Sequence, residues 1–239
     1  MKIQIIPCLH DNYSYLVIDE KNNIACAIDP SEAKPIIKYL EKKNINLKYI
    51  LNTHHHYDHV GGNQELKKKY NARVIGYKGD KDRIPEIDTL VDDQEIWKQE
   101  SFEAKIIHIP GHTLGHVCFY FFNEEAAFTG DTLFSLGCGK IFEGSYEQMF
   151  NSLMKIKALP LKTKIYCGHE YTKQNAKFCI THDKNNENLK NKIKIIDKKL
   201  ENNLPTIPST IREELDCNIF LRSNKVETFS KLRDLKDNF

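Results

Sequence analysis

The sequence has no long apolar run, no excess of charge of one sign and no closely spaced pair of cysteines. Its 35 lysine and arginine residues nearly balance 33 aspartate and glutamate residues, for a net charge of +2. Global electrostatics therefore predict neither a nucleic-acid partner nor a membrane partner. No apolar run is long enough to span a bilayer. Apolar and polar residues alternate in residues 1–17, and charged residues follow soon after, which favours a strand over a signal peptide.

The seven cysteines are scattered, odd in number and without a C-x-x-C pair. This spacing argues against a disulfide framework and favours a reducing compartment, so we expect a cytoplasmic protein. Most of these cysteines are expected to be small buried apolar residues. The 239 residues, 40% of them hydrophobic, suffice for a large domain with a real core, with or without a second, smaller domain.

Strand and helix signals alternate over the first two thirds of the chain. The expected strands lie at residues 2–8, 13–19, 24–29, 48–54, 72–77, 103–110, 116–122, 126–131 and 163–170. Helices are expected at 31–44, after a turn with helix-start chemistry, at 62–70, and after a capping box at Ser145–Gln148. The last of these helices is predicted to bury Met149, Phe150, Leu153 and Ile156.

After Tyr171 the strand signals vanish. The remaining chain predicts a Lys-rich helix with one apolar face, a turn-rich connector, a second capping box and a last helix. The residues that mark these features are Leu189, Ile193, Ile196 and Leu200; Thr210 and Glu213; and Val226, Phe229 and Leu232. We expect a catalytic domain at residues 1–170 followed by a small helical domain at residues 171–239.

Residues 54–59 read HHHYDH, between a predicted strand and a pair of glycines. A surface histidine run or a purification tag is the simplest alternative to a functional site. In an extended segment, however, His54 and His56 point to the same side and can bind one metal together. Asp58 and His59 follow the turn and can face a second metal. His55 points the other way, and we expect no ligand role for it.

Three later strand ends repeat this design, because His112, Asp131 and His169 each come directly after a glycine. A glycine lets the backbone approach a metal closely. Alone, each residue would be an ordinary core or turn residue. Together with the first cluster they make five histidines and two aspartates, which suit two divalent ions, zinc above all. Asp131 is the natural bridge, since one carboxylate can supply an oxygen to each metal.

Other histidines and one cysteine lie near these positions. His116 is expected to hydrogen-bond to a ligand, while His108 lies on a strand. Cys167 could in principle be a soft ligand, but its place inside a strand predicts burial. His10 and His182 have no partners by spacing and are expected to be structural.

Six characteristic segments follow one another along nearly the whole chain: THHHYDHVGGN, PGHTLGH, TGDTLF, GCGKIFEG, CGHEYT and KLRDLKDNF. In this order they resemble glyoxalase II, the hydroxyacylglutathione hydrolases of the metallo-β-lactamase superfamily. The resemblance implies an α/β fold class, a four-layer αββα sandwich followed by a small all-α C-terminal domain that binds glutathione.

The resemblance also implies roles for individual residues. The first metal would be bound by His54, His56 and His112, and the second by Asp58, His59 and His169, with Asp131 bridging. Asp29 resembles the family's supporting acidic residue. The implied glutathione contacts are Lys140, Phe142, Tyr171, Arg233 and Lys236. Arg233 and Lys236 lie three apart on the last predicted helix, so they share a face that suits a carboxylate. Phe142 departs from the family, whose members often carry a tyrosine there, as does Ile219, which replaces a proline.

The activity implied is hydrolysis of S-D-lactoylglutathione and related 2-hydroxyacylglutathiones to D-lactate and glutathione, the second step of methylglyoxal detoxification. Two metals about 3.5–4 Å apart would hold a bridging hydroxide as the nucleophile, with Asp58 and Asp131 as the catalytic ligands. Cys138 in GCGK is then not a nucleophile. The metals expected are zinc, with iron or manganese as alternatives.

Three alternatives stay open from the sequence. One is a persulfide dioxygenase or a lactonase on the same scaffold, and another is a nucleic-acid-processing member of the superfamily. The third is a metal-buffering or interaction protein without activity. We expect a monomer that binds a small-molecule glutathione thioester and neither nucleic acid nor a membrane.

Overall fold

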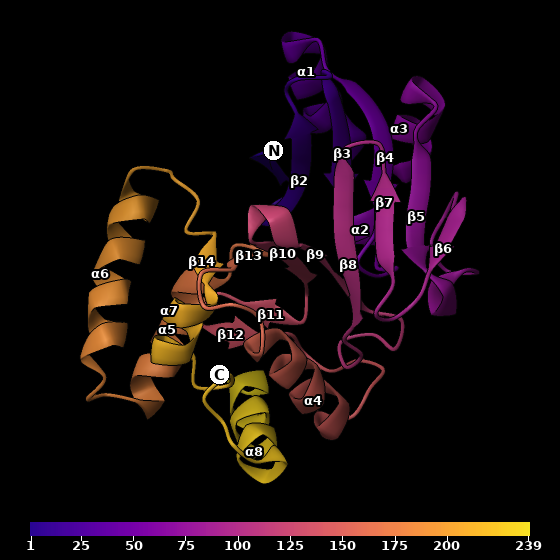
Figure 1. Cartoon of the computed structure of the whole chain (residues 1–239). Coiled ribbons are helices and arrows are strands. Elements are labelled where there is room, and N and C mark those ends of the chain that lie inside the picture. Colours follow the sequence, from indigo (N-terminus) through magenta and orange to yellow (C-terminus); the bar gives the residue numbers. More distant parts are fainter. The chain divides into compact units, whose positions relative to one another are not determined.

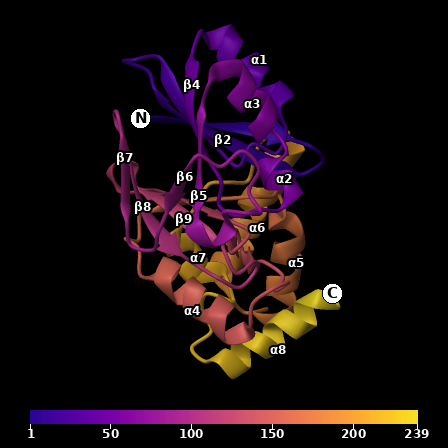
Figure 2. The ribbon, with the colours of Figure 1, turned by 90° about the vertical axis from the view of Figure 1, so that its right-hand side faces the viewer.

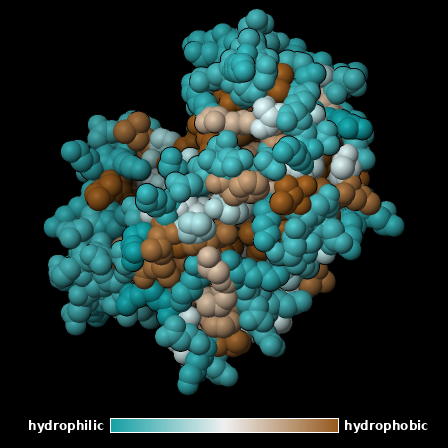
Figure 3. Space-filling view, viewed as in Figure 1, coloured by the Kyte–Doolittle hydropathy of each residue, from teal (hydrophilic) through white to brown (hydrophobic).

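The computed structural model describes residues 1–239, which form two compact units (Figure 1). The first unit comprises Met1–His108 and Gly115–Glu124, and the second comprises Ile109–Leu114 and Glu125–Phe239. None of the helices combines the length and the apolar character that crossing a bilayer requires. Figure 3 shows mostly hydrophilic residues on one face of the molecule, with hydrophobic residues gathered in patches.

The first unit is built on a six-stranded sheet in which spatial order follows chain order. Its strands are β1 (Lys2–Cys8), β2 (Asn12–Asp19), β3 (Ile24–Ile28), β4 (Asn46–Leu51), β5 (Arg73–Tyr77) and β6 (Thr89–Val91). The first three strands pair antiparallel, and β3 to β6 pair parallel. The carboxyl ends of the parallel strands therefore meet at one edge, where the loops can carry functional residues.

Two helices, α1 (Ala33–Lys43) and α3 (Asn63–Tyr70), cover one face of this sheet (Figure 2). Their buried residues Ile36, Leu40 and Leu66 join one apolar cluster with side chains of β1 to β5. On the other face, Tyr49 of β4 contacts Trp97 and Phe102 edge-on, at centroid distances of 5.3 and 5.9 Å. Those two residues belong to the antiparallel ladder of β7 (Ile96–Gln99), β8 (Phe102–His108) and β9 (Val117–Phe121). Both faces of the sheet are thus covered within this unit.

The second unit contains three further paired strands and the later helices. In it β10 (Ala126–Gly130) pairs parallel with β13 (Lys164–Cys167), which pairs antiparallel with β14 (Ser209–Thr210). A short hairpin joins β11 (Leu133–Phe134) and β12 (Gly137–Cys138). The helices are α4 (Tyr146–Lys157), α5 (Thr172–His182), α6 (Glu187–Glu201), α7 (Ile211–Cys217) and α8 (Val226–Asp237).

Both predicted capping boxes are confirmed. The Ser145 hydroxyl accepts from the Gln148 backbone N–H at 3.1 Å, and the Gln148 side chain accepts in return at 2.9 Å. Thr210 and Glu213 form the same reciprocal pair at the start of α7. Each box satisfies two N–H groups that the first turn of a helix leaves without an intrahelical partner.

Several local predictions were wrong. The turn before α1 supplies no side-chain cap, because the N-cap residue is Glu32 and its carboxylate accepts from the Leu9 backbone N–H at 2.8 Å instead. Phe150 is only half-buried, unlike Met149, Leu153 and Ile156. A strand, β14, lies beyond Tyr171, where none was expected. Three elements, α5, β6 and β7, were not predicted, because their apolar residues are too few or too irregularly spaced to indicate a helix or a strand.

Candidate metal centre

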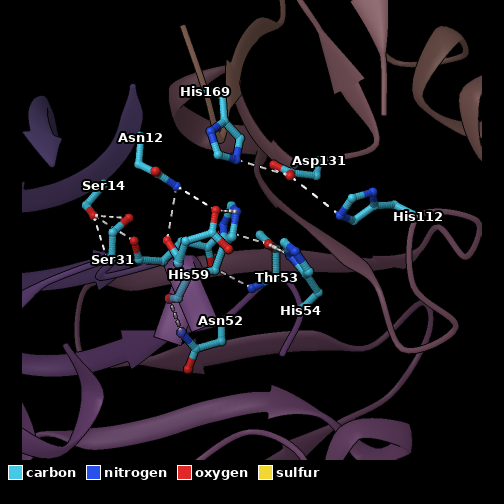
Figure 4. Close-up of polar contacts among 12 residues, drawn as sticks. Asn12, Ser14, Ser31, Asn52, Thr53, His54, His59, His112, Asp131 and His169 are labelled. Carbon is cyan, nitrogen blue, oxygen red and sulfur yellow. Dashed lines mark hydrogen bonds and ion pairs between the residues drawn. The ribbon is translucent and has the colours of Figure 1, made fainter. Parts of the chain in front are cut away.

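The histidine-rich segment lies where β4 ends, and it enters the single turn of α2 (Tyr57–Val60). Within it His54 and His59 are buried, whereas His56 is half-buried. The Asn52 side chain secures this loop from below, because its amide donates to the His59 carbonyl at 3.1 Å (Figure 4). A buried hydrogen bond of this kind holds the backbone of the loop against the end of the strand.

Asp29 anchors the same loop from the end of β3, with 3% of its surface exposed. Its backbone lies in the left-handed region, with φ +46°. One carboxylate oxygen accepts from the Thr53 backbone N–H at 2.7 Å, and the other accepts from the Thr53 hydroxyl at 2.6 Å. The second oxygen is also 2.9 Å from His59 Nδ1. The acidic residue expected to support the site therefore contacts the ligand loop directly.

These hydrogen bonds determine which ring nitrogen each histidine presents. The Thr53 hydroxyl gives its hydrogen to Asp29, so it accepts from His54 Nδ1 at 3.0 Å. His59 Nδ1 likewise donates to the Asp29 carboxylate. A neutral imidazole with a protonated Nδ1 carries its lone pair on Nε2. Both rings are therefore prepared to bind a cation through Nε2, the usual arrangement of metal-binding histidines.

Asp58 is oriented by a residue that the sequence did not mark. The Asn12 amide donates to Asp58 Oδ2 at 3.0 Å and to the Asp58 carbonyl at 3.2 Å (Figure 4). This places Asp58 Oδ2 3.8 Å from His59 Nε2. The carboxylate and the imidazole thus lie close together, as expected for a ligand pair. Across the same segment, the His54 and His56 rings lie 4.7 Å apart.

His55 contacts a different group, which agrees with the expectation that it has no ligand role. Its Nδ1 lies 3.3 Å from Oδ2 of the fully buried Asp80, whose other oxygen accepts from Arg83. Gly115 passes so close to this carboxylate that a Cβ there would meet it at 2.0 Å. His116, the next residue, stacks on His54 with centroids 4.6 Å apart. This ring contact is with an expected ligand, and the hydrogen bond expected of His116 stays a prediction.

The second unit carries its own imidazole and carboxylate cluster, formed by His112, Asp131 and His169. Asp131 Oδ2 lies 3.5 Å from His112 Nε2 and 3.2 Å from His169 Nε2. Figure 4 shows the two rings pointing at this carboxylate from different sides. All three residues are buried. The cluster thus places one carboxylate oxygen close to two imidazole Nε2 atoms.

The backbone around this cluster needs glycine. Gly130 ends β10 with φ +46°, and Gly111 has φ +152°. At Gly139 a Cβ would lie 1.8 Å from the Asp131 carbonyl. His112 Nδ1 donates to the Lys140 carbonyl at 2.7 Å, so this ring too presents Nε2 as its lone-pair atom. Tyr171 stacks on His169 with centroids 4.7 Å apart, which restrains the orientation of that ring.

Cys167 has the properties of a buried thiol and not of a metal ligand. Burial raises its pKa to about 12, and its Sγ donates to the His169 carbonyl at 3.4 Å. The thiolate is the form that binds metals. The expectation that Cys167 is buried in its strand is confirmed.

The residues expected to contact glutathione all lie in the second unit. Lys140 Nζ lies 5.8 Å from the centroid of the exposed Phe142 ring, and Phe142 contacts His112 edge-on at 5.2 Å. Arg233 of α8 is buried and donates to the Cys138 carbonyl at 2.7 Å. Arg233 also pairs with Asp237, at 2.8 Å. The hydrogen bond to Cys138 links α8 to β12, two residues before Lys140.

Sequence reasoning missed Asn12 and Thr53, which orient the ligand loop. Asn12 contacts Asp58 from 46 positions away. Thr53 looks like an ordinary strand-end residue beside the histidines. No periodicity or spacing marks such residues, since their role depends on which hydrogen bond the folded chain lets them make.

Two family models together match residues 13–239 of the chain. The model described as "Metallo-beta-lactamase superfamily" matches residues 13–169, and the model described as "Hydroxyacylglutathione hydrolase C-terminus" matches residues 170–239. These models meet close to the boundary predicted at residue 170. The compact units divide the chain elsewhere, and the domain boundary stays a prediction.

Curated relatives with the name hydroxyacylglutathione hydrolase align along the full length. The protein of Pelagibacter ubique is 81% identical over 239 residues and 100% of both chains. That of Methylococcus capsulatus is 42% identical over 253 residues, covering 100% of this chain and 99% of the relative. Identity at this level over the whole length shows membership of the same family.

Solved structures at lower identity share the fold. The B3 metallo-beta-lactamase BLEG-1 aligns with a TM-score of 0.74 at 21% identity, covering 93% of this chain and 100% of its own. ETHE1 from Myxococcus xanthus aligns with a TM-score of 0.75 at 21% identity, covering 98% of this chain and 90% of its own. They confirm the predicted α/β fold class, and the C-terminal family model confirms the helical end.

Imidazole and carboxylate clusters in both units, within a superfamily fold that holds metals, indicate divalent metal binding. By its full-length relatives and its two matching family models, the chain belongs to the hydroxyacylglutathione hydrolases, thioester hydrolases of the metallo-β-lactamase superfamily.

Proposed function

We propose that the chain hydrolyses S-D-lactoylglutathione and related 2-hydroxyacylglutathiones to D-lactate and glutathione. It would thus carry out the second step of methylglyoxal detoxification. The observation that carries this proposal is the set of histidines whose Nδ1 is already committed to a hydrogen bond, so that Nε2 is presented as a ligand. The identity to curated hydroxyacylglutathione hydrolases supports the choice of substrate.

The donor set fits two borderline divalent ions, for which we propose zinc. One ion would be held by His54, His56 and His112, and the other by Asp58, His59 and His169, with Asp131 shared between them. Neutral imidazoles and carboxylates suit zinc, iron and manganese alike, and soft thiolates are missing because Cys167 is held as a thiol. The buried hydrogen-bond network around Asp29 supports this assignment, since it prepares His54 and His59 before any ion arrives.

When bound, such ions would polarise the thioester carbonyl and lower the pKa of a water molecule towards neutrality. The chain's own residues would then position the reactants. Asn12 holds the Asp58 carboxylate towards His59. Tyr171 keeps the His169 ring in one orientation by stacking on it. No side-chain nucleophile is needed, and the buried thiol of Cys138, with its raised pKa, is unsuited to that role.

For the glutathione half of the substrate we propose Lys140, Phe142, Tyr171, Arg233 and Lys236. All five residues belong to one compact unit. Three are cations, and glutathione carries two carboxylates, so the charges are complementary. All seven cysteines are free and buried, which supports a reducing, cytoplasmic setting, and we propose that the protein acts as a monomer.

The decisive experiment measures hydrolysis of S-D-lactoylglutathione by purified protein together with its metal content. We expect turnover of the thioester and close to two ions per chain. A protein that ignores this thioester but consumes oxygen with glutathione persulfide, using one iron, would instead be a persulfide dioxygenase. A protein that opens lactones would be a lactonase, and either result would refute the proposal.

Adjacent histidines provide a matched pair for the metal assignment. His55 and His56 are both half-buried, but only His56 is a proposed ligand. We expect His56→Ala to lose one ion and most activity, while His55→Ala keeps both ions. Equal metal loss in the two variants would contradict the assignment.

A further inference from the structure

Each of the three cations proposed for glutathione lies over a phenylalanine ring. The Lys140 ammonium is 5.8 Å from the Phe142 centroid, and the Arg233 guanidinium is 5.3 Å from the Phe220 centroid. Lys236 lies over two rings, with its Nζ 5.4 Å from the Phe178 centroid and 5.2 Å from the Phe239 centroid. A cation is attracted to the face of an aromatic ring within about 6 Å.

The rings around Lys236 also contact one another. Phe178 and Phe239 meet edge-to-face, with centroids 5.2 Å apart and planes at 71°. Phe178 in turn stacks on Phe220, at 5.8 Å and 17°. Phe178 and Phe220 are fully buried, whereas Phe239 is 55% exposed. Phe178 of α5 thus contacts Phe220, which lies between α7 and α8, and Phe239, which follows α8. Phe178 and Phe239 form a cage around the Lys236 ammonium group.

The two cations of α8 differ in how their charge is balanced. Arg233 shares its charge with Asp237 at 2.8 Å and gives another hydrogen to the Cys138 carbonyl. The Lys236 ammonium group makes no ion pair and no hydrogen bond, and it lies over the two rings. A carboxylate partner would neutralise the ammonium group, but an aromatic face holds it and leaves its charge and its three N–H donors for another anion.

The surroundings of the cage favour an anion as its occupant. Burial lowers the pKa of Lys236 because it disfavours the charged ammonium group. The neighbouring Arg233 lowers it further because the two positive charges repel each other. An incoming carboxylate would relieve this repulsion and accept the hydrogens that the rings cannot accept. Asp237 also faces this region, but it is engaged by Arg233 through two hydrogen bonds, at 3.1 and 2.8 Å.

We propose that Phe178 and Phe239 are positioning residues that cage Lys236 as an uncompensated cation for a carboxylate of the thiol half of the substrate. This inference rests on the proposed function and deepens it. It makes the phenyl rings, and not only the cations, determinants of specificity for anionic thioesters. A thioester of the same acyl group without a carboxylate would gain nothing from the cage.

Phe239→Ala tests the cage at an exposed position, where loss of folding is not expected. A partly exposed cation–π contact corresponds to about a two- to fivefold change in binding. We expect KM for S-D-lactoylglutathione to rise by that factor with kcat unchanged, the pattern of lost uniform binding. Phe239→Tyr keeps a ring and should retain the wild-type KM. Leu235→Ala, which removes another exposed side chain of α8, serves as the matched control.

A double-mutant cycle separates the cage from a general structural effect. In a Lys236→Met background, Phe239→Ala should change KM no further, because the caged charge is already gone. Hydrolysis of S-D-lactoyl-N-acetylcysteamine, which has no carboxylate, should be the same in the wild type and Phe239→Ala. A KM increase that persists in either case, or no increase at all, would overturn the inference.

Binding of S-methylglutathione, measured by calorimetry on the metal-loaded protein, gives a reading that does not depend on turnover. Phe239→Ala should weaken this binding about two- to fivefold. Equal affinities of the wild type and the variant would refute the proposed role of the cage. If the wild type binds this thioether but fails to cleave the thioester, the proposed function falls while the binding comparison still decides the cage.

Discussion

Replacing Asp29 by asparagine should weaken metal binding about 10- to 100-fold, the usual effect of losing a residue that orients a ligand. Asp29 accepts three hydrogen bonds, from the Thr53 backbone N–H at 2.7 Å, the Thr53 hydroxyl at 2.6 Å and His59 Nδ1 at 2.9 Å. An asparagine keeps the size of the side chain, and it tolerates the left-handed backbone at φ +46°. The substitution therefore removes one negative charge and alters the hydrogen bonding without changing the size of the side chain.

Either orientation of the new amide leaves a donor facing a donor. If its nitrogen faces Thr53 N–H, the loop that carries His54 must move. If its nitrogen faces His59, the ring must shift its proton to Nε2, the atom needed for the metal. An unsatisfied buried donor costs about 1–3 kcal/mol, and about 1.4 kcal/mol corresponds to a factor of ten, so a 10- to 100-fold loss is expected.

The assay is competition for zinc between the protein and a chelator of known affinity, with circular dichroism to verify folding. Thr53→Ser keeps the hydroxyl that links His54 to Asp29, and it should retain the wild-type affinity. Thr53→Val removes that link and should lose affinity. Unchanged zinc affinity in folded Asp29→Asn, or equal losses in the two Thr53 variants, would refute the reasoning.

Three further predictions follow from separate contacts. Phe142→Tyr adds a hydroxyl to a ring that is 62% exposed, and we expect KM for S-D-lactoylglutathione to fall about two- to tenfold in steady-state kinetics; an unchanged KM would contradict a hydrogen bond there. A thiol-alkylating reagent should modify no cysteine of the folded protein and leave its activity intact, because all seven are buried and burial raises the pKa of Cys167 to about 12; mass spectrometry would reveal any labelling. Ser101→Ala should move acid unfolding to higher pH, because the Ser101 hydroxyl, 2.6 Å from Asp19, and the Asn22 side chain lower the Asp19 pKa to about 2. That stability is present above about pH 4 and is lost as the pH falls through about 2, and equal acid midpoints by fluorescence would refute it.

Much of the local structure was predictable because it depends on neighbours in the sequence. The capping boxes at Ser145 and Thr210 are reciprocal pairs three residues apart, and such pairs form wherever a helix begins. The strand β1 coincides with its predicted range, since its alternation is clear. Glu32 shows the limit of this reasoning, because its carboxylate accepts from the backbone N–H of Leu9, 23 positions away, and does not cap α1.

The same division runs through the candidate site. The residue types and spacing in HHHYDH, and the glycines before His112, Asp131 and His169, were enough to predict a metal centre and to leave His55 out of it. Spacing carries this information because side chains alternate along an extended segment and because only glycine lets the backbone come so close. The sequence by itself thus determined the chemistry of the ligands and, through the resemblance, the family.

Only the tertiary structure decided which nitrogen each imidazole presents and how the cations are held. Asp29 and Asn12 reach the ligand loop from other strands, and their hydrogen bonds orient His59 and Asp58. Phe178 and Phe239 lie 61 positions apart in the sequence but meet around Lys236. Such contacts depend on the direction of hydrogen bonds and on the packing of rings. Both are fixed only when distant segments are folded together.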